Sequence, residues 1–457
     1  MSTLPTRIER EAGRRLEASE IVNITAARER MLSRMLMLYI STGVVFMLLP
    51  GTFLGVWNLL TISSHRAAKS VSPAWIQAHG HAQIFGWIGS FILGIGFYSI
   101  PKLRRMGSFA LAPVWFAWGL WTSGVALRWL GSVYPWHWRF LVPLSSVCEL
   151  VAFLVFFRIV SGHKADNSGK ATLDEWVLVV IAGSVGLLLT LLVNVGIAFY
   201  LSFQSTSPEV PANVDQRFLV LETWGCLVPF VWGFSAKWLP VFLGLRPVRG
   251  RILLLAIGLN SSGVLLALAG AILPATVFML AGLVTAITAL RLFEPAERPA
   301  KVKGVHVSFP FFVRLAYIWA LIASVMSVWA AMSRDASGIW GASRHALTVG
   351  FLAMMVFSIG QRVLPAFSGM RLLFSTKLMF GSLLLLAVGC LLRVSSEVLA
   401  YPGIVPSAWS LLPTSAICEM AAVTVFAFNL LSTFAREAPA TMAQPVANTD
   451  SPTAKPF

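Results

Sequence analysis

Long apolar runs separated by short polar connections make up the chain from about residue 33 to residue 434. Each run is close to or above the 20 or so residues that an α-helix needs to cross the hydrocarbon core of a bilayer. We therefore expect an all-α integral membrane protein. Twelve membrane-spanning helices are predicted over residues 33–60, 75–100, 109–131, 138–160, 173–202, 217–243, 252–270, 272–292, 310–332, 340–367, 375–398 and 405–434.

The polar connections alternate in charge. Those after even-numbered helices are rich in Lys and Arg, whereas those after odd-numbered helices have few, and "SFQSTSPEVPANVD" has none. Because Lys- and Arg-rich loops stay in the cytoplasm, both termini are predicted to be cytoplasmic. Residues 1–32 are expected to form a cytoplasmic amphipathic segment before the membrane domain of residues 33–434, and residues 435–457 a disordered cytoplasmic tail.

The composition supports a membrane protein and excludes two other classes. The 457 residues are 57% hydrophobic and only 12% charged, which is too few charges to cover a soluble protein of this length. The formal net charge of +16 lies in connections and termini, so no basic face remains for nucleic acid. All four cysteines lie in apolar runs without a CxxC pair, which argues against a disulfide framework.

A repeat is visible when three helices are aligned on Pro101, Pro240 and Pro365. Fifteen residues before each proline stands a glycine, and five residues before it a small residue. This spacing predicts three pseudo-repeats of four helices, at about residues 33–160, 173–292 and 310–434. The alternative is that small residues recur only because they let membrane helices pack closely.

Two histidines occupy one register of this repeat. His81 and His345 each lie twenty residues before the aligned proline, where the middle repeat has Val220, followed two residues later by Glu222. Both helices enter from the outer face, so the two imidazoles are predicted at the same depth in the outer leaflet. Two such imidazoles suit the axial ligation of a heme iron. The alternative is a pair of polar packing residues.

His79 poses a separate question, because residues two apart on a helix point about 200° apart. His79 and His81 therefore cannot both serve one heme in the same way. Either His79 binds a second metal or heme, or it hydrogen-bonds at the outer rim.

Other ionisable residues fall inside the apolar runs. Arg128 and Arg393 lie near the outer ends of their helices, where they either bind heme propionates or snorkel to lipid headgroups. Glu149 and Glu419 each follow a cysteine and either relay protons or hydrogen-bond between helices. Glu222 either faces a metal or bound water, or it pairs with Arg217 or Lys237.

Two helices carry a family resemblance. "AHGHAQIFGWIGSFILGIGFYSIPKL" and "HALTVGFLAMMVFSIGQRVLPAFSGM" resemble the signature helices of the NnrS family, and "HALTVG" stands intact at residues 345–350. The twelve helices are also distantly similar to subunit I of the heme-copper oxidases, where helices 2 and 10 hold a low-spin heme. The resemblance implies a protein of the bacterial inner membrane with a b-type heme on His81 and His345, and with copper as a further cofactor. It also implies a role in nitric oxide metabolism or tolerance.

The sequence departs from the oxidase pattern at the reacting centre. Ser343 stands where the oxidases have the first histidine of helix 10, and predicted helices 6 and 7 contain no histidine for copper. The usual heme-copper binuclear centre is therefore not expected, and whether the protein is an oxidoreductase stays open.

The resulting hypothesis is a heme-binding membrane protein with a redox or gas-handling role. Its partners would be the lipid bilayer, nitric oxide or another small gas, and an electron donor such as a quinol or a cytochrome. The candidate metal ligands are His79, His81, His345 and Glu222, and Arg128 and Arg393 are candidate cofactor-binding residues. The alternatives are a membrane transporter or metal- or heme-handling protein, and a cofactor-free assembly factor for a respiratory complex.

Overall fold

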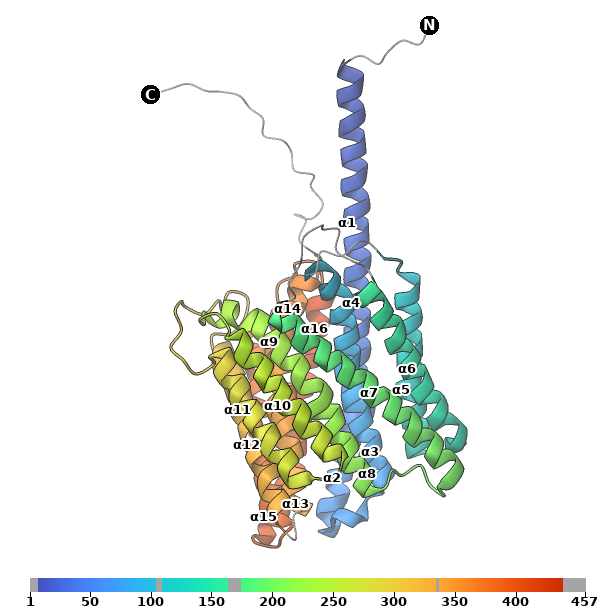
Figure 1. The fold of residues 1–457 in the computed structure, drawn as a ribbon, viewed down its shortest axis with the longest axis vertical. Coiled ribbons are helices and arrows are strands. Elements are labelled where there is room, and N and C mark those ends of the chain that lie inside the picture. Colours follow the sequence, from blue (N-terminus) through green and yellow to red (C-terminus); the bar gives the residue numbers. More distant parts are fainter. Residues whose placement is uncertain (1–6, 104–108, 163–173, 334–336, 439–457) are drawn as a thin grey trace.

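The computed structural model describes residues 7–103, 109–162, 174–333 and 337–438, and every regular element in these ranges is a helix. Figure 1 shows the helices side by side in one bundle, with α1 projecting beyond it. The bounds are α1 (Arg7–Phe46), η1 (Met47–Phe53), α2 (Leu54–His65), η2 (Ala68–Ser70), α3 (Pro73–His81), η3 (Ala82–Gly89), α4 (Ser90–Leu103), α5 (Ala112–Val133), α6 (Trp138–Gly162), α7 (Glu175–Gln204), α8 (Ala212–Val220), η4 (Leu221–Leu227), α9 (Val228–Leu243), α10 (Gly250–Leu268), α11 (Ile272–Leu290), α12 (Phe309–Met332), α13 (Ser337–His345), η5 (Ala346–Ala353), α14 (Met354–Phe367), α15 (Thr376–Ala400), η6 (Pro406–Ser410) and α16 (Leu411–Ala435).

The predicted fold class is confirmed. Within the described ranges, eleven helical segments are long and apolar enough to cross a bilayer. Helix α5 has a comparable length but is not among them, and its four tryptophans and Arg128 make it less apolar than its neighbours. From residue 75 onwards the predicted ranges agree with the helices to within a few residues. The first helix differs, because it runs without a break from Arg7 to His65 through η1 and so begins well before residue 33. The exact count of twelve spans stays a prediction.

The first and the last helix of the chain have their free ends at the same end of the bundle. The start of α1 and the end of α16 point to the same end of the molecule, where α9 also ends. The predicted orientation depends on basic residues in the connections. Arg104, Arg105, Lys164 and Lys170 are among these and lie outside the described residues, as does most of the predicted tail. Which membrane face this end occupies therefore stays a prediction.

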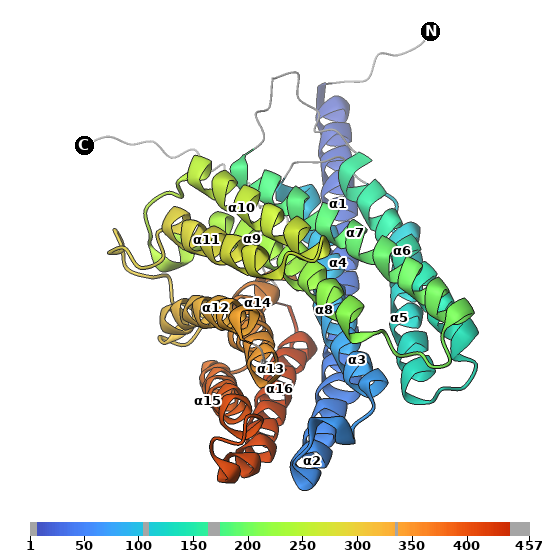
Figure 2. The same cartoon turned by 60° about the horizontal axis from the view of Figure 1, so that its bottom comes forward.

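The helices gather in three neighbouring groups that follow the chain. Figure 2 shows the blue-to-teal helices α1–α6, the green-to-yellow helices α7–α11 and the orange-to-red helices α12–α16 beside one another. Within the middle group, α7 approaches η4 so closely that a Cβ added to Gly186 would lie 1.9 Å from the carbonyl oxygen of Gly225. Glycine is required at this crossing. The grouping is compatible with three pseudo-repeats, which remain a prediction.

Each of the three proline-aligned helices contains a π-helical segment, which the sequence did not predict. The segments η3, η4 and η5 begin directly after His81, Val220 and His345, nineteen residues before the respective proline. A π segment widens the helix and changes which side chains face a neighbour, and such segments are common at functional sites. A fourth π segment, η1, follows α1 and contains Pro50. These segments surround the cavity described next.

A candidate cofactor cavity

A cavity of about 440 Å³ opens between the helical segments that carry the predicted site residues. Helices α2, α3, α8, α13, α15 and α16 and the π segments η3, η4 and η5 contribute to its wall, and Arg128 reaches it from α5. The structure brings all six predicted site residues together here, namely His79, His81, Arg128, Glu222, His345 and Arg393.

His345 lies at the end of α13 and is fixed through both ring nitrogens. Its Nδ1–H group lies 3.0 Å from Oε2 of Glu397 and 3.0 Å from the carbonyl oxygen of Gly341. Its Nε2 accepts a hydrogen bond of 3.1 Å from Nη2 of Arg393. This pattern assigns the neutral tautomer with the proton on Nδ1. A carboxylate on Nδ1 is the usual support for a histidine that offers Nε2 to a metal.

Arg393 and Glu397 stand one turn apart on α15. Nε of Arg393 lies 2.9 Å from Oε1 of Glu397, which is an ion-pair distance, although the N–H group is not aligned for a hydrogen bond. Both side chains are buried. The two charges therefore balance each other away from water, and together they hold the ring of His345.

His79 offers a nitrogen that has no protein partner. Its Nδ1–H donates a hydrogen bond of 2.8 Å to the carbonyl oxygen of Gly51 in η1, and Gly55 of α2 leaves room for the ring. No described residue hydrogen-bonds Nε2 of His79. The side chain lines the cavity, within electrostatic range of His345 and Arg393.

His81 is arranged differently. Its Nε2–H donates a hydrogen bond of 2.7 Å to Oε1 of Glu149, and its ring stacks on Phe85 with centroids 4.4 Å apart. Glu149 is fully buried on α6 and also accepts a hydrogen bond of 3.2 Å from Nδ2 of Asn194 on α7. Glu149 thus links three helices, which is one of the two roles predicted for it. His81 keeps only Nδ1 for a further partner.

Two buried arginines face the cavity with unused donors. Arg128 is 6% exposed and Arg393 is 8% exposed. Neither Nη1 atom has a hydrogen-bond partner. Burial of these guanidinium groups within the bundle argues against the alternative that they snorkel to lipid headgroups. A buried cation with free donors is a binding site for an anionic group such as a carboxylate.

The acidic side chains of the cavity are also incompletely paired. Glu222 is buried and makes no hydrogen bond or ion pair to a described residue. The predicted pairing with Arg217 or Lys237 is not formed, because Arg217 donates to the carbonyl oxygen of Leu268 and Lys237 lies over the ring of Trp176. Glu419 lines the same cavity with Oε1 unpaired.

Sequence reasoning missed three charged residues of the wall. Glu397, Asp215 and Arg344 all line the cavity. The only available signal was the spacing of Arg393 and Glu397, four residues apart in an otherwise apolar helix, which is the spacing of an ion pair on one helix face. No comparable signal marks Asp215 or Arg344.

The donor set suits some cofactors better than others. Among the described residues, no three His, Cys, Asp or Glu side chains converge in a way that could hold a metal ion. A metal that relies on three or four protein ligands therefore finds no prepared site. A heme needs only one or two protein ligands, because its macrocycle supplies the others. The imidazoles and the free arginine donors fit a planar group with carboxylate tails.

Comparisons with known proteins agree with this architecture. The sequence model of the family described as "NnrS protein" matches residues 37–437. Among solved structures, the fold is similar to a heme-copper terminal oxidase dimer determined by cryo-EM, with a TM-score of 0.52 and 11% sequence identity. The match covers 90% of this chain and 86% of that chain. No curated protein matches the sequence.

Proposed function

Because the chain belongs to the NnrS family and has the fold of a heme-copper oxidase, we propose that it binds a b-type heme in this cavity. The observation that carries the proposal is the setting of His345, whose Nδ1 is supported by Glu397 and whose side chain lines a cavity that two further histidines also line. A bound heme supplies one-electron redox chemistry and a position where a diatomic gas can coordinate.

Different residues of the chain would hold different parts of this group. His345 would provide one nitrogen ligand, and α3 would provide another, from His81 as the repeat register favours or from His79, whose Nε2 has no partner among the described residues. Arg128 and Arg393 hold the two propionates, since both have buried donors without partners. Binding through Nε2 of His345 would require Arg393 to release this nitrogen, and its guanidinium would then be free for a carboxylate.

Copper is the second cofactor of the proposal. Glu222 and Nε2 of His79 line the cavity without a hydrogen bond to a described residue and are the candidate ligands, since carboxylate and imidazole both bind copper. Because each of these side chains would supply a single ligand, water or a substrate would have to fill the remaining positions.

The proposed role is redox chemistry or gas handling connected with nitric oxide, in the inner membrane of a bacterium. A quinol or a cytochrome serves as electron donor. If two histidines held the group, its chemistry would be electron transfer, and binding of nitric oxide would require one of these histidines to be free.

The test is a reduced-minus-oxidised absorption spectrum of the detergent-purified protein, with metal analysis. His345→Ala, His81→Ala and His79→Ala are compared with the wild type, and His65→Ala serves as control because His65 is exposed at the end of α2. We expect a low-spin heme spectrum that His345→Ala and one α3 variant abolish and that His65→Ala retains. A wild-type protein free of heme overturns the proposal and favours a transporter or a cofactor-free assembly factor.

A further inference from the structure

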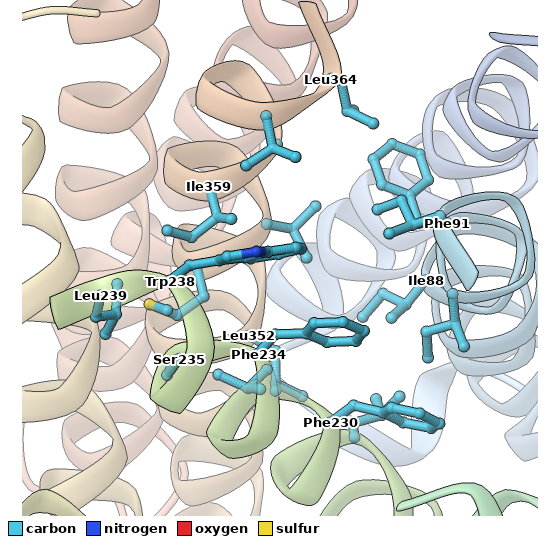
Figure 3. A pocket seen from close by; sticks show the side chains of 18 residues that line it. Ile88, Phe91, Phe230, Phe234, Ser235, Trp238, Leu239, Leu352, Ile359 and Leu364 are labelled. Atoms are coloured by element: carbon cyan, nitrogen blue, oxygen red, sulfur yellow. The ribbon is translucent and has the colours of Figure 1, made fainter. Parts of the chain in front are cut away.

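A second cavity, of about 120 Å³, lies at the centre of the bundle. Its wall is built by α4, α9 and α14 with their adjoining π segments, which are the three proline-aligned helices. Figure 3 shows these helices around it, with the side chains of Phe91, Phe234 and Ile359 among those that point into it.

The wall of this central cavity is almost entirely hydrocarbon. Ser235 and Trp238 are the lining residues with a polar side-chain atom. The hydroxyl of Ser235 already accepts a hydrogen bond of 2.9 Å from Tyr317. A buried water needs two to four polar partners, and a cavity without them stays dry. The central cavity is therefore a dry apolar space between the helices, open in part to its surroundings.

The central cavity adjoins the cofactor cavity. Ile88, Leu227 and Leu352 line both, one from each of the three π-containing helices, so a wall one side chain thick separates them. At the other end, the ring of Phe367 packs against Tyr98 at 4.9 Å and Trp238 at 6.4 Å between centroids.

We propose that the central cavity binds small apolar gas molecules, diatomics such as nitric oxide and oxygen among them. Apolar cavities of roughly 150 Å³ lined by Leu, Ile and Phe bind benzene or xenon. A cavity of about 120 Å³ accommodates a diatomic in full, whereas a lipid acyl chain or the chain of several isoprene units that a quinol carries would have to extend beyond it. Such gases lack the charge and strong dipole that would hold them in water, so a dry cavity concentrates them.

The position of the central cavity connects gas binding with the proposed function of the cofactor cavity. A gas molecule held against Ile88, Leu227 and Leu352 is one side-chain movement away from the cofactor cavity. This connection rests on the proposed heme function, whereas gas binding itself does not. The two can fail separately, because xenon reports the cavity whether or not the protein holds heme.

The experiment is ¹²⁹Xe NMR of the purified protein in detergent, with carbon monoxide as a diamagnetic diatomic competitor. We expect one saturable xenon site in the wild type, and carbon monoxide should displace xenon from it. Ile359→Phe fills the cavity and should remove the site. The matched control is Ile318→Phe on α12, where the side chain is 41% exposed on the outside of the bundle, and this variant should bind xenon like the wild type.

A second, milder variant keeps the test decisive if Ile359→Phe fails to fold. Val231→Leu adds one methylene to the cavity wall and should weaken xenon binding severalfold while the protein elutes as a single species in size-exclusion chromatography. The proposal is overturned if the wild type shows no saturable xenon site, if carbon monoxide does not compete, or if folded Val231→Leu and Ile359→Phe bind xenon as the wild type and Ile318→Phe do.

Discussion

Arg393 donates a hydrogen bond from Nη2 to Nε2 of His345, the nitrogen that a metal would need. The same guanidinium lies at ion-pair distance from Glu397, and Glu397 accepts from the other ring nitrogen of His345. The three side chains therefore form a closed unit in which each charge has a partner. A cofactor that binds His345 must open this unit on one side while Glu397 keeps its hold on Nδ1.

Removal of Arg393 should destabilise the cofactor-free protein strongly. Arg393→Ala leaves Glu397 buried without its cation, and breaking a buried ion pair in this way costs about 3–5 kcal/mol. Thermal unfolding in detergent measures the loss. The double variant Arg393→Ala with Glu397→Ala should recover part of the stability, because no uncompensated charge remains. A double variant as unstable as the single one would contradict the pairing.

Glu397 should raise the affinity of His345 for a metal without contacting the metal itself. Loss of a carboxylate that orients a histidine ligand typically lowers metal affinity by roughly 10–100-fold. We expect Glu397→Gln to weaken heme binding by this factor when heme is titrated into apoprotein. Glu419→Gln is the matched control, since Glu419 lines the same cavity but does not contact His345. Equal effects of the two substitutions would rule out the positioning role.

Close helix packing gives a prediction that is independent of any cofactor. Gly186→Ala would place a Cβ 1.9 Å from the carbonyl oxygen of Gly225, so α7 and η4 would have to separate. We expect a large loss of folded protein after detergent extraction. Gly196→Ala on the same helix meets nothing within 4 Å and should be neutral or slightly stabilising, because Ala favours helix by up to about 1 kcal/mol over Gly. Similar yields for both variants would mean that the crossing tolerates expansion.

The sequence determines the spans well and the site only in part. Apolar length locates the helices, and the proline register gives His81 and His345 equivalent positions in their helices, each directly before a π segment. The π segments have no such signature, since one bulged turn alters neither composition nor length. They change the direction of neighbouring side chains, and this is why the sequence could not show that His81 turns to Glu149 whereas His79 keeps a nitrogen free.

Arg128 and Arg393 allow a test of how the cavity recognises its ligand. If their unpaired donors hold the two carboxylates, Arg128→Leu should weaken heme binding by about tenfold or more, since a hydrogen bond to a charged group contributes roughly 1.5–3 kcal/mol. The same substitution should have little effect on heme dimethyl ester, which has no free carboxylate. Spectroscopic titration of apoprotein with both compounds separates the two cases. Arg139→Leu is the control, because Arg139 lies outside the cavity and donates to the carbonyl oxygen of Ser205. If Arg128→Leu weakened the ester and the acid equally, the arginine would contribute to the shape of the cavity and not to carboxylate recognition.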